Sequence, residues 1–127
     1  MNFQKKVTRN NYVRETIRVL NGLLDLTPRE IDILLVMMKI DIAWQPKTTM
    51  DTKDLMSTDN RKLILKECNI NKGNFTKIVN KLRSMKILVK SQDGKTIVNE
   101  LLVPTITKVK DKNLIEIKFV LEVADAV

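Results

Sequence analysis

The chain has no histidine, one cysteine and three glycines among its 127 residues. Cys68 cannot form an internal disulfide and is expected to be a buried core residue, and without histidine the chain offers too few ligands for a zinc site. The three glycines form neither a P-loop nor a G-x-G-x-x-G motif. Asp51, Asp54 and Asp59 lack the glycine and terminal glutamate of a calcium loop. We therefore expect a protein that is not an enzyme and that uses no metal and no cofactor.

Long apolar runs are missing as well. No segment is long enough to cross a bilayer, and the N-terminus lacks the apolar stretch of a secretion signal. We expect a soluble protein that is cytoplasmic or, if encoded by a phage, associated with the virion. A chain of this length with 43% apolar residues suits a single core. We divide it into a flexible basic arm (1–10), a single domain (11–123) that includes a C-terminal β-hairpin (about 104–122), and a tail (124–127).

The net charge of +8 is unevenly distributed. Residues 1–20 hold five Lys or Arg against one acid, and residues 72–112 hold ten against three, whereas the rest of the chain is slightly acidic. Two positive regions of this kind favour a polyanionic partner over a uniformly solvated surface.

Two helices are expected in the first third of the chain. The pattern of residues 12–24 fits a helix better than the alternative of a strand. Thr27 as N-cap, Pro28 in the first turn and Glu30 three residues after Thr27 predict a capping box. The helix they start runs to about Ile42 and is apolar on nearly all sides, so we expect it to be the central core helix.

A helix, a turn and a second helix follow. Residues 61–68 form a short amphipathic segment preceded by Ser57 or Thr58 as cap, residues 69–71 a turn, and Asn71 the N-cap of the next helix. This second helix has one apolar stripe, formed by Phe75, Ile78, Val79, Leu82 and Met85. Its other side is polar and free of acids, and consists of Lys72, Asn74, Thr76, Lys77, Asn80, Lys81, Arg83 and Ser84.

The rest of the chain has β character. Residues 87–91 and 96–103 flank Asp93-Gly94, a strong hairpin signal. A second hairpin is predicted from residues 105–109, a turn at 111–113, and a long strand from Leu114 to Leu121.

This order of elements resembles a winged helix-turn-helix. The segment Leu26-Thr27-Pro28-Arg29-Glu30 and the stretch from Asn69 to Val89 are similar to those of MarR-type regulators and of the winged-helix modules of plasmid and phage replication initiators. The resemblance covers residues 11–103. It implies an α+β fold of N-terminal helices followed by β-hairpins, and duplex DNA binding, usually as a homodimer, with the second helix in the major groove and the wing at the backbone or minor groove.

The leading hypothesis is a duplex DNA-binding protein that acts in transcription regulation or replication initiation by occupying a site. Lysines supply contacts to phosphates, while asparagine and threonine supply contacts to base edges. The candidate DNA-binding residues are Lys72, Asn74, Thr76, Lys77, Asn80, Lys81 and Arg83 on the helix, and Lys90, Gln92 and Lys95 on the wing.

A protein-docking module is the alternative hypothesis. A winged helix can dock on a polymerase, a replication complex or a phage particle component instead of DNA. The contact surface would then be the edge of the strand Leu114 to Leu121, or Trp44, which otherwise covers the edge of the core.

Overall fold

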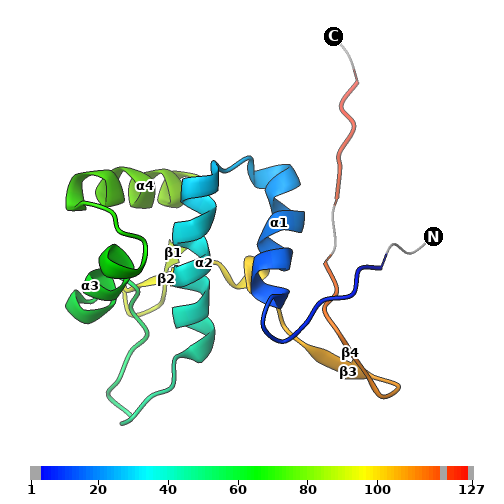
Figure 1. Cartoon of the computed structure of the whole chain (residues 1–127), viewed down its shortest axis with the longest axis horizontal. Helices are drawn as coiled ribbons and strands as arrows, with labels where there is room; N and C mark the ends of the chain where they lie inside the picture. Colours follow the sequence, from blue (N-terminus) through cyan, green and yellow to red (C-terminus); the bar gives the residue numbers. More distant parts are fainter. Residues whose placement is uncertain (1–3, 118–119, 126–127) are drawn as a thin grey trace.

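The computed structural model describes residues 4–117 and 120–125. Four helices come first, and two small antiparallel β-hairpins follow them, which confirms the predicted α+β class (Figure 1). The order is compatible with the layout of a winged helix-turn-helix. The elements are α1 (Tyr12–Leu24), α2 (Pro28–Ala43), α3 (Thr58–Glu67), α4 (Lys72–Ser84), β1 (Leu88–Lys90), β2 (Thr96–Val98), the 3-10 helix η1 (Glu100–Leu102), β3 (Thr107–Val109) and β4 (Lys112–Leu114).

Helix α2 is the centre of the core, as predicted. Its capping box is complete, because Thr27 Oγ1 accepts from the Glu30 N–H and a Glu30 carboxylate oxygen accepts from the Thr27 N–H. Helices α1 and α3 and strand β2 contact it. The side chains that α2 buries most completely are Ile33, Leu34, Met37 and Met38.

Residues 12–24 form a helix, as the stronger of the two interpretations predicted. Val13, Ile17 and Leu20 are buried, one helical turn apart, and Leu24 is half-buried. The helix ends at Asp25 in the left-handed conformation, where the backbone N–H bonds the carbonyl oxygen of Asn21.

Helix α3 starts three residues earlier than predicted. Ser57 is the N-cap of α3 and accepts from the Asn60 N–H. Asn69 turns the chain in the left-handed conformation, with φ of 48°, and Ile70 N–H bonds the Leu65 carbonyl. Cys68 is buried at the end of α3, as expected, and burial raises the pKa of its thiol.

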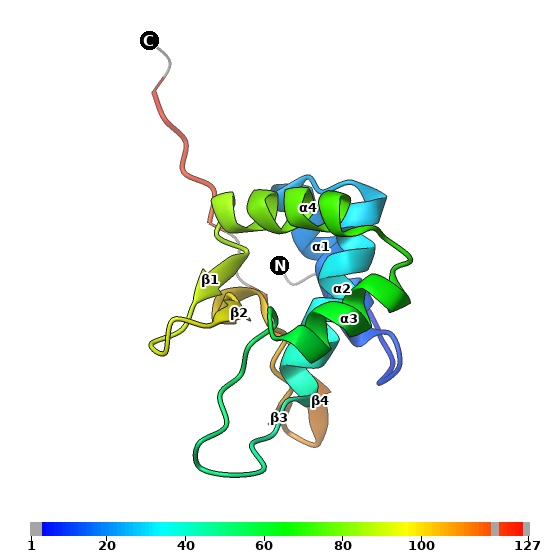
Figure 2. The same ribbon diagram turned by 90° about the vertical axis from the view of Figure 1, so that its left-hand side faces the viewer.

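The first hairpin, called the wing here, is the pair β1–β2 with its loop at residues 91–95. Its register pairs Leu88 with Val98 and Lys90 with Thr96. Gly94 closes the loop with φ of 75°, and its N–H bonds the Ser91 carbonyl, as Asp93-Gly94 predicted. Figure 2 shows the wing below one end of α4 and α3 below the other end.

The strand predicted over residues 96–103 is mostly wrong. Pairing ends at Val98, and residues 100–102 form η1 instead. The cause is local, because the Asn99 side chain caps η1 by accepting from the Leu101 N–H and donates to the Lys86 carbonyl.

The long strand from Leu114 to Leu121 is also wrong. Strand β4 ends at Leu114, and residues 115–117 and 120–125 have no regular secondary structure, while Lys118 and Phe119 lie outside the described residues. The turn lies at Lys110 and Asp111, both with positive φ, so Lys112 and Asn113 belong to β4. Strand β3 offers only three pairing residues, which leaves the later apolar residues without a partner strand.

No helix in residues 4–117 and 120–125 has both the length and the apolar character that crossing a membrane requires.

Candidate nucleic-acid interface

Helix α4 is fixed at both ends and along one side. Asn71 Oδ1 accepts from the Asn74 N–H at 2.8 Å, and Arg29 Nη2 donates to the Asn69 carbonyl, which ties the turn before α4 to the start of α2. Phe75, Val79 and Leu82 are buried as predicted, and Ile78 is half-buried. Met85 departs from the prediction, because it is the exposed C-cap residue rather than part of the core.

The polar residues of α4 divide into three strips around the helix axis. At 100° per residue, Lys77, Asn80 and Ser84 lie opposite the buried stripe and point to solvent. Lys72, Thr76 and Arg83 lie toward α3, and Asn74 and Lys81 toward the start of α2. Every one of these predicted polar positions is exposed, and α4 carries no acid.

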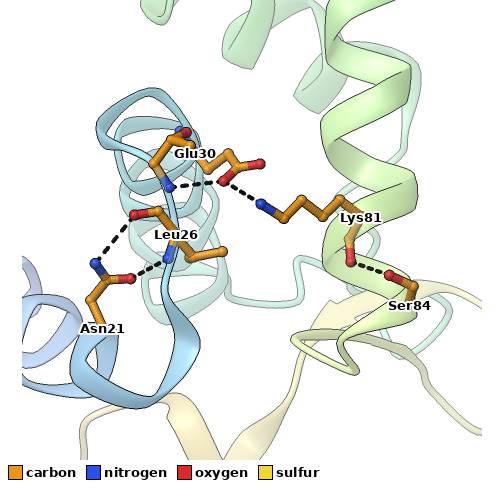
Figure 3. A network of polar contacts seen from close by, with 6 residues as sticks. Asn21, Leu26, Glu30, Lys81 and Ser84 are labelled. Carbon is orange, nitrogen blue, oxygen red and sulfur yellow. Dashed lines mark hydrogen bonds and ion pairs between the residues drawn. The ribbon is translucent and has the colours of Figure 1, made fainter.

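Lys81 is engaged within the protein. Its Nζ donates to Glu30 at 2.8 Å, across 51 residues of sequence (Figure 3). Burial alone would raise the pKa of Glu30, but the hydrogen bonds from Lys81 and from Thr27 outweigh it, so the pKa lies below 4.5. Lys81 therefore takes part in a structural ion pair, whereas Lys77 is exposed and lies opposite the buried stripe of α4.

A basic groove separates α3 from α4. Its volume is about 390 Å³, with an apolar floor that includes Leu65, Phe75 and Val79. Four cationic side chains line it, and no acid does among the described residues. These cations are Arg61 and Lys62 from α3, and Lys72 and Arg83 from α4.

Arg61 and Lys62 were missed by sequence reasoning. They belong to a segment that is slightly acidic as a whole, so the charge count along the chain hides them. Their place beside α4 depends on how the two helices pack, which periodicity does not reveal. The amphipathic pattern of residues 61–68 could have identified them, because it places both side chains on the exposed face of the helix.

The wing adds a second basic strip. Lys90, Gln92 and Lys95 are exposed on β1 and the loop, with Asp93 between them at the tip. These three residues follow the α4 residues in the sequence. The fold keeps the wing next to α4, because β1 contacts α4.

Thr96 joins the wing to α4 and to the segment before α3. Its carbonyl accepts from Leu55 N–H at 2.9 Å, its N–H donates to Asp54 Oδ1 at 3.3 Å, and its hydroxyl accepts from Arg83 at 3.1 Å. Asp41, buried in α2, accepts from Val98 N–H and from Lys53. These bonds hold the wing, the entry to α3 and the end of α4 in one arrangement.

Asp51 and Trp44 have structural partners. Asp51 accepts from the N–H groups of Lys47 and Thr48, and these bonds lower its pKa. Trp44 is half-buried at the C-cap of α2, with Lys53 Nζ 5.7 Å from its ring centroid. Within the described part of the chain, no group of His, Cys, Asp or Glu side chains could hold a metal ion.

No family model, curated protein or solved structure matches this chain. The interface must therefore be interpreted from its own chemistry. Exposed lysine and arginine can bind phosphates, and asparagine and threonine on one helix face can bond base edges.

Proposed function

We propose that the protein binds duplex DNA, with α4 in the major groove and the wing against the neighbouring backbone. The observation that carries this proposal is the acid-free surface of α4, which continues into the groove lined by Arg61, Lys62, Lys72 and Arg83. Such a surface is complementary to a phosphate backbone.

The proposed roles follow from position. Lys77 and Asn80 lie on the outermost strip of α4, so both enter the groove, where Asn80 is suited to adenine and the Lys77 ammonium neutralises phosphate charge. Arg61, Lys62 and Lys72 flank the helix and contact phosphates. Lys90 and Lys95 contact phosphates from the wing, and by occupying its site the protein acts in transcription or replication.

Salt-dependent binding to labelled duplex DNA of random sequence tests the proposal. We expect affinity to fall steeply with salt, because each phosphate neutralised contributes a slope of about −0.9 in log K against log salt. Lys77→Ala and Arg61→Ala should each lower the magnitude of that slope by about 1. Lys108→Ala is the matched control, since Lys108 is exposed on β3, away from α4 and the wing (Figure 1).

Negligible binding at low salt would overturn the proposal, as would equal losses in all three variants. Selection of preferred DNA sequences then tests the base contacts. Asn80→Ala should reduce the preference for the selected sequences rather than weaken binding to all sequences uniformly.

The alternative of a protein-docking module relied on two contact surfaces, the edge of a strand and Trp44. The first does not exist as predicted, because strand β4 ends at Leu114 and does not extend to Leu121. Trp44 remains exposed in part, but its ring already contacts Lys53. Binding of protein partners without any affinity for duplex DNA would favour that alternative.

A further inference from the structure

The basic region at the N-terminus is not used by the candidate interface. Residues 1–20 hold five Lys or Arg against one acid, Glu15. In the structure all five cationic side chains are exposed, on the arm that precedes α1 and on α1 itself. We call these five residues the arm surface: Lys5, Lys6, Arg9, Arg14 and Arg18.

Hydrogen bonds hold the arm beside the start of α1. Lys5 Nζ donates to a Glu15 carboxylate oxygen at 2.6 Å. The Thr8 N–H donates to Asn11 Oδ1 at 2.8 Å, and the Thr8 carbonyl accepts from the N–H groups of Asn11 and of the first residue of α1. Figure 1 shows the arm looping below α1 before the helix begins. A surface that is already ordered loses less entropy when it binds a partner.

Glu15 is engaged within the arm surface. Lys5 and Arg18 both pair with it, at 2.6 Å and 2.9 Å, and the hydrogen bond from Lys5 is the main cause of its lowered pKa. The carboxylate is therefore ionised and paired at neutral pH. By contrast, Lys6, Arg9 and Arg14 form no ion pair with any residue that the structure describes. These three cations are available to an external anion.

The length of α1 separates these three cations from α4. They lie before α1 or in its first turn, whereas the other end of α1 leads to the start of α2, where Glu30 bonds Lys81 of α4. The 13 residues of α1 rise by about 20 Å. This distance exceeds the Debye length of about 8 Å at physiological ionic strength. The three cations therefore add little to the attraction of a duplex that lies on α4.

We propose that the arm surface binds a second segment of duplex DNA, so that one chain bridges two duplexes. Lys6, Arg9 and Arg14 neutralise phosphates of this second segment without reading its sequence. A duplex is the partner because its backbone presents closely spaced negative charges, which complement unpaired cations on a surface whose acid is already paired. The bridging rests on the proposed function, which supplies the first duplex at α4.

A two-duplex capture assay with the full chain tests the bridging. A random-sequence duplex is immobilised on beads, protein is added, the excess is washed away, and a fluorescent second duplex is offered at low salt. We expect wild type to capture the second duplex. The triple variant Lys6→Ala, Arg9→Ala, Arg14→Ala should capture at least about tenfold less, because it loses three phosphate contacts. Its retention on the immobilised duplex should change by less than about twofold, because these cations lie far from α4.

Two further variants control for the loss of charge. Lys39→Ala, Lys47→Ala, Lys108→Ala removes the same charge from exposed side chains outside the arm, α3, α4 and the wing, and it should capture as much as wild type. Exchanging Lys for Arg and Arg for Lys at the three arm positions keeps the charge and should preserve capture. Loss of capture in either variant would contradict an electrostatic contact at the arm surface.

Retention and capture also separate this inference from the proposed function. A wild type that is not retained on the immobilised duplex overturns both. Retained protein that captures no second duplex overturns the bridging alone, and so does undiminished capture by the triple alanine variant at the arm. Binding of the arm surface to vesicles that contain phosphatidylserine, without capture of a second duplex, would likewise overturn it.

Discussion

The side chain of Glu30 makes both a local contact, within the start of α2, and a long-range contact, with α4. It closes the capping box of α2, is only 7% exposed, and accepts from Lys81 in a helix 51 residues away. A buried carboxylate needs such partners because burial penalises its charged form. The pair therefore fixes the orientation of α4 relative to the start of α2.

Removing the ammonium group of Lys81 should destabilise the protein, by an amount that depends on pH. We expect Lys81→Ala to lower the free energy of unfolding by about 1 kcal/mol at pH 7, a modest value because Lys81 is 42% exposed. The folded pKa of Glu30 lies below 4.5, so the pair stabilises fully above that value and loses its effect as pH falls through the folded pKa. Urea unfolding of wild type and variant at several pH values measures this.

Lys77→Ala is the matched control, because Lys77 is exposed on the same helix, and its effect on unfolding should stay within about 0.5 kcal/mol. A difference between Lys81→Ala and wild type that does not shrink as pH falls below the usual range of carboxyl pKa values would contradict the ion-pair explanation.

Single residues were predictable from sequence where the signal is local. Thr27 and Asn71 were identified as caps because their partners lie three residues away. The bonds of Lys81 to Glu30 and of Arg83 to Thr96 join separate elements. No local pattern reveals them, so both side chains were placed with the free DNA-binding residues.

At the scale of elements, the junction between α4 and β1 sets the direction of the wing. Lys86 follows the helix with φ of 61°, and the next residue, Ile87, donates its N–H to the Leu82 carbonyl. This is the usual way a helix ends at a left-handed residue, but the position generally prefers glycine.

Glycine at this junction should stabilise the protein. We expect Lys86→Gly to raise the free energy of unfolding by about 0.5 to 1 kcal/mol, because it removes the strain of a left-handed lysine. Met85→Gly is the neighbouring control with φ of −83°, and it should destabilise instead. Chemical unfolding measures both, and equal losses in the two variants would show that Lys86 carries no such strain.

Helices were predicted better than strands for a physical reason. Caps and a period of 3.6 residues are contained within each helix, so residues 12–24 and 28–42 could be recognised by themselves. A strand requires a partner elsewhere. Residues 101–103 and 115–117 were predicted to be strands, but they have no partner strand in the structure, and only three residues pair in each strand of the two hairpins.

For the whole molecule, opposite sides carry different chemistry. The basic groove and the wing lie with α3 and α4, while the exposed apolar side chains lie with α1 and the C-terminal part (Figure 1). The charge distribution along the sequence predicted Lys72, Arg83 and the wing lysines on the first of these sides, but not Arg61 and Lys62. It did not predict the second, because exposure of Leu23 or Val123 depends on what the fold leaves uncovered.

The bonds at Thr96 bear on how a duplex would be read. Thr96 ties β2 to α4 and to the segment before α3. The distance between α4 and the loop of the wing is therefore fixed in the protein without nucleic acid. A duplex has to present its two contact points at that fixed separation, and sequences whose groove width or twist differs must deform to comply. Discrimination between sites would then arise partly at base pairs that no side chain touches.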